Sequence, residues 1–228
     1  ARAVTVDTSA ELIQAIDDAN SGGDKTIIIK DGVYDLDQML WLDADNVTVR
    51  GESGNRDAVV LQGPGMDGGV SHIFNVAGSD FSLSDLSVGR VANHAVQIHG
   101  ENDADRPVIR NVRFFDTYEQ MLKVSYDSSS QAGSDEGVVE DCVFIYTAGI
   151  GPQYYIGGID AHNARNWVIR SNEFHDIQSP ESDWAEHAIH FWSDSQGTLV
   201  EGNLIVNCDR GIGFGLGDRG HQGGIIIN

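Results

Sequence analysis

A short apolar strand recurs along the chain at irregular intervals of 26–34 residues, and this repeat limits the fold more than any other feature. Units of this size that are rich in β-forming residues and differ in loop length are typical of a β-solenoid. A propeller blade would need about 40 residues and four strands. The repeat therefore predicts a parallel β-helix whose equivalent core positions are Val49, Leu83, Ile109, Val139, Ile169, Val200 and Ile226.

Alternation within each strand predicts which side chains face the core, because successive residues point to opposite sides of a sheet. The second strand of the later coils is predicted to stack Phe114, Phe144, Phe174 and Ile205, with Asn172 and Asn203 forming structural hydrogen bonds along the axis. The first strand is predicted to supply two inward rows, namely Leu40, Phe74, Val96, Leu122, Ile159, Ile189, Ile212 and Leu42, Val76, Ile98, Val124, Ala161, Phe191, Phe214.

The chain ends are predicted to differ from the coils. A capping box from Thr8 to Glu11 begins a helix over 8–21, which Gly22 and Gly23 stop and which would cover the open end of the solenoid. The coils occupy 39–228, so 1–228 reads as one elongated domain. The sequence stops at Asn228 inside an apolar strand, and we expect either a longer natural chain or a chain–chain contact there.

Charge and composition exclude several classes of function. A net charge of −21 disfavours nucleic acid and anionic membrane surfaces, although an acidic surface could gather Ca²⁺. No apolar run is long enough to predict a membrane-spanning helix. Cys142 and Cys208 should lie about two coils, or roughly 10 Å, apart, which predicts free thiols.

The outward positions of the first strands carry an unusual set of side chains. One row reads Trp41, Asn75, Gln97, Lys123, Asp160, His190, Gly213, and its neighbour reads Asp43, Ala77, His99, Ser125, His162, Trp192, Gly215. Six of the eight histidines fall on this strip, namely His72, His94, His99, His162, His187 and His190. Because Gly213 and Gly215 lack side chains, we expect them to leave His190 and Trp192 uncovered, with room for a ligand.

The most compact polar group on the strip comprises Lys123, Asp160, His162, His190 and Trp192, on three adjacent coils. A histidine titrates near neutral pH and can act as an acid or a base. Asp160 could hold Lys123 or a histidine in its charged form. Asp160, His162 and His190 would alternatively suit a transition metal.

Aromatic and polar side chains beside this group are what a carbohydrate site needs. Sugar C–H faces pack on aromatic rings, for which Trp192 and the loop residue Tyr155 are candidates. Sugar hydroxyls take hydrogen bonds, for which we expect Gln97, His99 and His187 to serve.

The helix TSAELIQAIDDAN, the strand–turn TIIIKDGVYDL and coils ending in IRNVRF, IRSNEF or VEGNLI resemble the pectate-lyase-like superfamily, and the N-terminal portion most resembles its alginate and chondroitin lyases. The resemblance implies an all-β, single-stranded right-handed parallel β-helix. In such lyases a cation, often Ca²⁺ or an arginine, neutralises the uronate carboxylate, and a lysine or arginine removes the C5 proton. It thus implies Lys123 as base, Arg210 as acid or carboxylate neutraliser, and Ca²⁺ as a cofactor. Asp160 is the candidate metal ligand from its place between Lys123 and His190 in the row. The two cations should lie roughly 14 Å apart, which is far for one sugar.

Three functions follow as hypotheses. The first is a secreted or periplasmic polysaccharide lyase that cleaves an acidic polysaccharide by β-elimination. The second is an inverting glycoside hydrolase, which needs carboxylates about 6.5–9.5 Å apart. The rows supply Asp160 alone, and Asp183, Glu186 and Asp194 are available only from loops. The third is a non-catalytic carbohydrate-binding or adhesin module.

Overall fold

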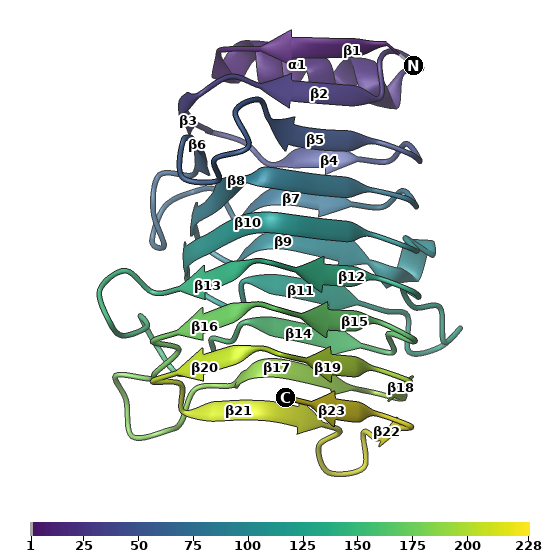
Figure 1. Ribbon diagram of the computed structural model, residues 1–228, viewed down its shortest axis with the longest axis vertical. Helices are drawn as coiled ribbons and strands as arrows, with labels where there is room; N and C mark the ends of the chain where they lie inside the picture. Colours follow the sequence, from purple (N-terminus) through teal and green to yellow (C-terminus); the bar gives the residue numbers. More distant parts are fainter. Residues whose placement is uncertain (1) are drawn as a thin grey trace.

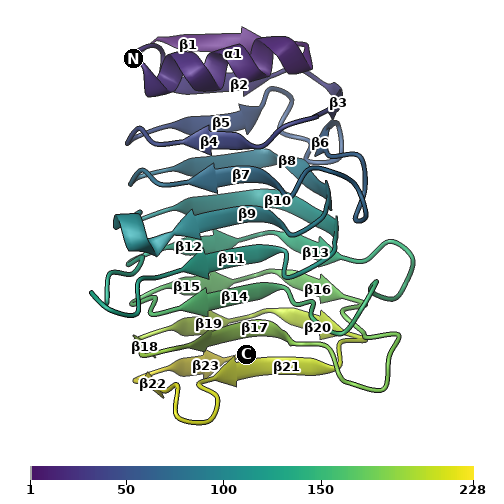
Figure 2. The same cartoon turned by 180° about the vertical axis from the view of Figure 1, so that it is seen from behind.

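The computed structural model describes residues 2–228 as a right-handed parallel β-helix of about 8 turns. Figures 1 and 2 show the coils stacked along the long axis from the N-terminal helix to the last strand. All pairings between the named strands are parallel, as the repeat predicts. The predicted all-β right-handed β-helix is therefore confirmed.

One face of the solenoid is a seven-stranded sheet, which faces the viewer in Figure 2. We call it the site sheet because it carries the polar strip. Its strands, in spatial order, are β4 (Leu40–Leu42), β7 (His72–Val76), β9 (His94–His99), β11 (Leu122–Ser125), β14 (Ile159–His162), β17 (His187–Trp192) and β21 (Arg210–Phe214).

A fourteen-stranded sheet forms the rest of the wall and faces the viewer in Figure 1. We call it the back sheet. Its main path is β1 (Ala3–Val6), β2 (Thr26–Ile29), β5 (Thr48–Gly51), β8 (Ser82–Val91), β10 (Val108–Thr117), β12 (Val138–Glu140), β15 (Val168–Arg170), β19 (Leu199–Glu201) and β23 (Ile225–Ile227). Its side branches are β3 (Gly32–Asp35), β6 (Val59–Gln62), β13 (Val143–Ile145), β16 (Glu173–His175) and β20 (Leu204–Val206). A separate pair joins β18 (Ser195–Gln196) and β22 (His221–Gln222), and a 3-10 turn covers Gly100–Asn102.

The register of both sheets agrees with the predicted rows. Leu122 pairs with Val96 on one side and with Ile159 on the other, and Ile169 pairs with Val139 and Val200. In the core, the Phe114, Phe144 and Phe174 rings stack nearly parallel, with centroids 4.4 and 4.6 Å apart. The period-2 alternation thus identifies the buried side chains of the inner coils correctly. It is wrong for Ile226, which is 57% exposed because no further coil covers the last strand.

The N-terminal helix α1 (Ser9–Asn20) covers one end of the solenoid, as predicted. The Thr8 hydroxyl oxygen accepts a hydrogen bond from the Glu11 N–H at 3.1 Å and satisfies one free donor of the first turn. Ala15 is buried on the face of the helix that packs on the core, whereas Ile13 is only partly buried.

The asparagine and cysteine predictions are also confirmed. The Asn172 side chain donates to Asn203 Oδ1 at 3.0 Å and accepts from the Cys142 N–H at 2.9 Å, so it links three coils. Cys142 is buried, Cys208 is half-buried, and both are free thiols.

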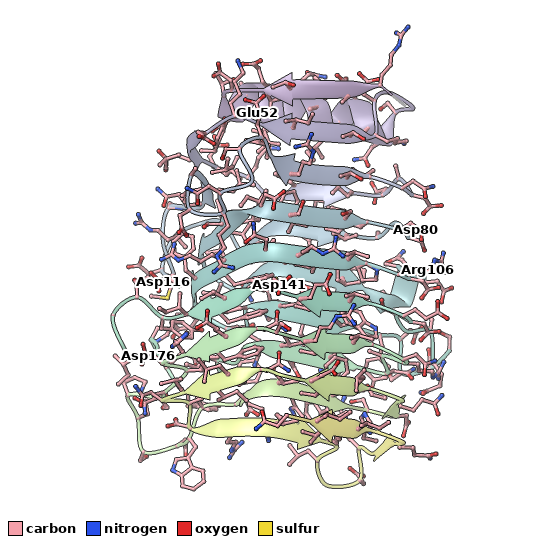
Figure 3. The ribbon with its side chains drawn as sticks, viewed as in Figure 1. Glu52, Asp80, Arg106, Asp116, Asp141 and Asp176 are labelled. Atoms are coloured by element: carbon pink, nitrogen blue, oxygen red, sulfur yellow. The ribbon has the colours of Figure 1, made fainter. Side chains whose placement is uncertain are left out.

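At the corner that follows four strands of the site sheet, an equivalent position just before the next strand has a left-handed backbone. Asp80, Arg106, Glu136 and Asn166 have φ values of 59°, 56°, 61° and 59°. Figure 3 shows Asp80 and Arg106 together at this corner, where they form an ion pair at 2.8 Å. Asp116 and Asp176, also left-handed, lie at the opposite corner. These corners bring the strands of each coil into register with the strands of the preceding coil.

The final strand, β23, pairs with β19 and leaves Ile225, Ile226 and Ile227 exposed. Between residues 2 and 228, no helix is long and apolar enough to cross a membrane.

Candidate functional site

Three neighbouring strands of the site sheet bring the predicted polar group together. The register places Lys123 of β11 beside Asp160 of β14, and Asp160 beside His190 of β17. One row further along, His162 lies beside Trp192. The structure therefore assembles all five members of the predicted group; we call them, with the loop residues described below, the Asp160 cluster.

Asp160 lies at the centre of the cluster, and its side chain is only 8% exposed. Its Oδ2 accepts from Lys123 Nζ at 2.5 Å, and its Oδ1 accepts from the Trp192 indole N–H at 2.8 Å. Burial opposes ionisation, but the hydrogen bond from His162 and the Lys123 ammonium hold the pKa of Asp160 well below its usual range. Because both oxygens face donors, the contacts favour an ion-pair role for Asp160 over a metal-ligand role.

His162 connects the carboxylate to the outer part of the cluster. Its Nε2 lies 3.1 Å from Lys123 Nζ, and its Nδ1 lies 2.8 Å from the Ser193 hydroxyl. Burial, reinforced by the charges of Lys123 and Arg219, lowers the pKa of His162 although Asp160 opposes the shift. The two cations, Lys123 at Nε2 and Arg219 at Nδ1, can only donate, so they face both ring nitrogens of a neutral His162.

Sequence reasoning missed Arg219, which reaches the cluster from the loop after β21. Its Nη2 donates to the Tyr126 hydroxyl at 3.2 Å and lies 3.1 Å from His162 Nδ1. Its guanidinium lies 4.2 Å from the centroid of the Trp192 ring, in cation–π contact. The cluster therefore has a second cation beside Lys123.

Aromatic rings form a continuous series across the cluster. The Tyr126 and His162 rings are nearly parallel with centroids 5.5 Å apart, and His162 and Trp192 are 4.8 Å apart. Trp192 then stacks on His190 at 4.5 Å, and His190 lies 4.2 Å from His187. Because its neighbours hold Trp192 on several sides, its orientation is fixed before any ligand arrives.

The expected open space over the glycines of β21 is not present, and that prediction is wrong. A Cβ at Gly213 would lie 2.6 Å from His187 Nε2, so the His187 ring occupies the space that the glycine leaves. His190 is only 2% exposed, and its Nε2 lies 3.3 Å from the Gly215 carbonyl oxygen. The missing side chains let neighbouring imidazoles pack down instead of leaving a pocket.

Arg210 lies at the start of β21, opposite His187, and two strands separate β21 from Lys123. Its Nη1 lies 3.6 Å from Glu186 Oε2. Burial raises the pKa of Glu186, against the opposing effect of Arg210. Arg210 is thus paired with a loop carboxylate, and the Asp160 cluster holds a different arginine.

The predicted substrate-binding residues Gln97 and His99 form a second network on β9. Gln97 accepts from or donates to partners on both neighbouring strands, with His72 Nε2 at 2.7 Å and Ser125 Oγ at 3.0 Å. His99 Nδ1 lies 3.1 Å from Glu101, and the His99 ring stacks on the half-exposed Trp41. The strip therefore continues from the cluster towards the helix-capped end.

Tyr155 lies at the other end of the strands from Trp192. It precedes β14 in a long loop, whereas Trp192 is the last residue of β17, and the two strands are parallel. The Tyr155 ring packs against Tyr154, with centroids 6.3 Å apart, and is exposed. The two aromatic residues therefore flank the strip from opposite edges.

No family model and no curated protein sequence matches the chain. Among solved structures, the chain is similar to an alginate lyase from Paenibacillus sp. str. FPU-7, with a TM-score of 0.64 at 13% identity, covering 100% of this chain and 98% of that one. It is also similar to the pectin methylesterase PemA from Erwinia chrysanthemi, with a TM-score of 0.57 at 15% identity, covering 90% of this chain and 66% of that one. The chain therefore shares the right-handed parallel β-helix fold with these structures.

Proposed function

We propose that the protein is a secreted or periplasmic carbohydrate-active enzyme, and specifically a polysaccharide lyase that cleaves an acidic polysaccharide. The observation that carries the proposal is the Asp160 cluster, which gathers Lys123, Arg219, Tyr126 and a neutral His162 on one outer face. The chain has only 14 basic residues and a net charge of −21. The similar alginate lyase and pectin methylesterase act, by their names, on uronate polymers, which supports this substrate class.

β-Elimination requires three groups at such a site: a cation, a base and an acid. A cation must neutralise the uronate carboxylate so that negative charge can develop as the C5–H bond breaks. A base must take that proton, and an acid must protonate the O4 leaving group as the C4–O4 bond breaks and the C4–C5 double bond forms. Arg219 is suited to the carboxylate, because guanidinium groups bind carboxylates in two-point contacts.

The proton transfers fall to the remaining polar groups. Neutral His162 is the candidate base. Lys123, 3.1 Å from its Nε2, is held as an ammonium by Asp160 and fixes its position. The Tyr126 hydroxyl, which Arg219 contacts, is the candidate acid. Asp160 touches no substrate in this scheme and fixes Lys123 and Trp192 in place.

Incubation with alginate, pectate and chondroitin sulfate tests the proposal, with and without Ca²⁺. We expect absorbance of the unsaturated product to rise with one of them. Arg219→Ala should abolish that signal, whereas Arg110→Ala, on the back sheet, serves as the matched control. A flat absorbance trace on every uronate polymer would reject the lyase.

A glycoside hydrolase is the second candidate, and the two carboxyl groups near His190 favour it. Burial raises the pKa of Glu186, whereas the pKa of Asp160 is lowered, and such a divergence separates a general acid from a general base. This enzyme would release reducing ends without a chromophore, and an esterase would release methanol from methylated pectin. A binding module would yield no product yet lose affinity on Trp192→Ala.

A further inference from the structure

Glu186, His187 and His190 form a compact group at the start of β17. One ligand atom from each residue lies within 4.8 Å of the other two. The two imidazole rings are close, with centroids 4.2 Å apart and planes at 38°. Two imidazoles and one carboxylate are a set that Zn²⁺ binds, with a fourth position open to water or a ligand.

His187 has a ring nitrogen that the protein does not satisfy. Its Nδ1 is buried and has no hydrogen-bond partner among the described residues. A buried polar atom without a partner costs free energy, and such atoms are rare in native structures. A metal ion is one partner that would satisfy this atom.

The rings are positioned by the backbone of the next strand. The His187 ring lies directly on Gly213, where any Cβ would collide with Nε2, Cδ2 and Cε1. His190 is held by Gly215 O at 3.3 Å from its Nε2. The glycine at 213 is therefore required for the present position of the His187 ring.

The carboxylate of the group has a cation beside it. Arg210, 3.6 Å from one Glu186 oxygen, competes for that carboxylate.

We propose that Glu186, His187 and His190 bind a Zn²⁺ ion. The site shares His190 with the Asp160 cluster but uses none of the groups that carry the proposed elimination. Tetrahedral Zn²⁺ places its ligand atoms about 3.3 Å apart, given Zn–N distances of about 2.0–2.1 Å. The group would close from 4.8 Å by rotation of the half-buried Glu186 and His187 side chains. Imidazole ligands favour Zn²⁺ over Ca²⁺, which prefers oxygen.

Titration of chelator-treated full-length protein with Zn²⁺ tests the site by calorimetry, and Co²⁺ absorbance reports the ligand geometry. We expect one ion per chain and a Zn²⁺-dependent rise in Tm. His187→Ala and Glu186→Gln should each weaken binding by more than about tenfold. His175→Ala is the matched control, because His175 lies on β16 and pairs with Glu173 at 3.2 Å.

A second pair of variants leaves all three ligands in place. Gly213→Ala should displace the His187 ring and weaken Zn²⁺ binding, whereas Gly211→Ala on the same strand meets only Ile205 at 4.0 Å and should not. Circular dichroism of each variant checks the fold. Less than one Zn²⁺ per chain, or equal affinity in His187→Ala and His175→Ala, would overturn the proposal.

Discussion

The two faces of the solenoid use the same kind of ion pair in opposite ways. On the back sheet, Glu140 of β12 lies between Arg110 and Arg170, at 2.5 and 2.7 Å, and the arginine side chains are 55% and 44% exposed. On the site sheet, Lys123 and Asp160 pair across adjacent strands in the same manner but are only 15% and 8% exposed. Parallel strands in register create both contacts, so the difference lies in what covers them.

Burial changes how much an ion pair contributes to stability and how firmly its charges are oriented. The Glu140 side chain is only 12% exposed, but both of its arginine partners keep their solvent. The ladder therefore contributes little to stability and is screened by salt. The Lys123–Asp160 pair is enclosed by Trp192, His162 and Arg219, which fix the orientation of each charge. A buried charged group that is so constrained is costly to maintain, which points to a functional role for the site sheet.

Removal of one carboxylate from each face should give the largest difference in stability between the two faces. Asp160→Asn leaves the Lys123 ammonium buried without a counter-ion, and we expect a loss of about 3–5 kcal/mol in the free energy of unfolding. Glu140→Gln should change it far less. Urea denaturation of both variants measures the difference, and equal losses would show that burial does not distinguish the faces.

Activity should depend on one face alone. If the lyase proposal holds, Lys123→Met should lower kcat/KM about 10³-fold, because His162 then lacks the group that fixes its position. Arg110→Met on the back sheet should leave kcat/KM unchanged. Comparable losses in the two variants would place the chemistry elsewhere.

The free energy of unfolding should depend on pH because of a buried histidine on the site sheet, His94. Burial lowers the pKa of His94 from 6.5 to about 3, so below pH 6.5 the unfolded chain binds a proton that the folded chain does not, and stability falls as pH drops from 6.5 towards 3. His94→Asn should reduce that slope by about 1.4 kcal/mol per pH unit, and His175→Asn should not. An unchanged slope in His94→Asn would show that His94 does not cause the pH dependence. The groups around His94 are the Gln120 carbonyl, Glu119, His72, Lys123 and Asp160.

Salt should affect only the exposed ladder. At about 1 M salt the Debye length is roughly 3 Å, so the small stability difference between Glu140→Gln and the parent should vanish. The difference for Asp160→Asn should persist, because solvent ions do not reach the buried pair. Denaturation at low and high salt checks this, and a salt-sensitive Asp160→Asn effect would contradict it.

Most of the fold and about half of the site could be predicted from the sequence. The alternation of Ile159, Asp160, Ala161 and His162 determines which side faces outward, and the repeat determines which residues become neighbours. Both rules are local and are unaffected by loop length. That is why the five strand residues of the cluster were found.

The loop residues follow no such rule. Arg219 reaches Trp192 because Leu216 and Arg219 exchange hydrogen bonds at 2.9 and 3.0 Å in a tight turn, with Gly215 and Gly217 at positive φ. The flanking glycines were the available signal for this turn. The Gly213 prediction failed for a related reason, because a missing side chain can be filled by a neighbour such as His187.

The phenylalanine stack in the core has a consequence for the opposite face. Phe114, Phe144 and Phe174 belong to the same coils as Lys123, Asp160 and His190, since each phenylalanine strand directly precedes its site-sheet strand. The ring spacings of 4.4 and 4.6 Å are close to the roughly 4.8 Å between hydrogen-bonded strands, which also sets the interval between Lys123, Asp160 and His190. Removal of the Phe144 ring would therefore leave a cavity in the core of the coil that carries Asp160, without touching a polar atom.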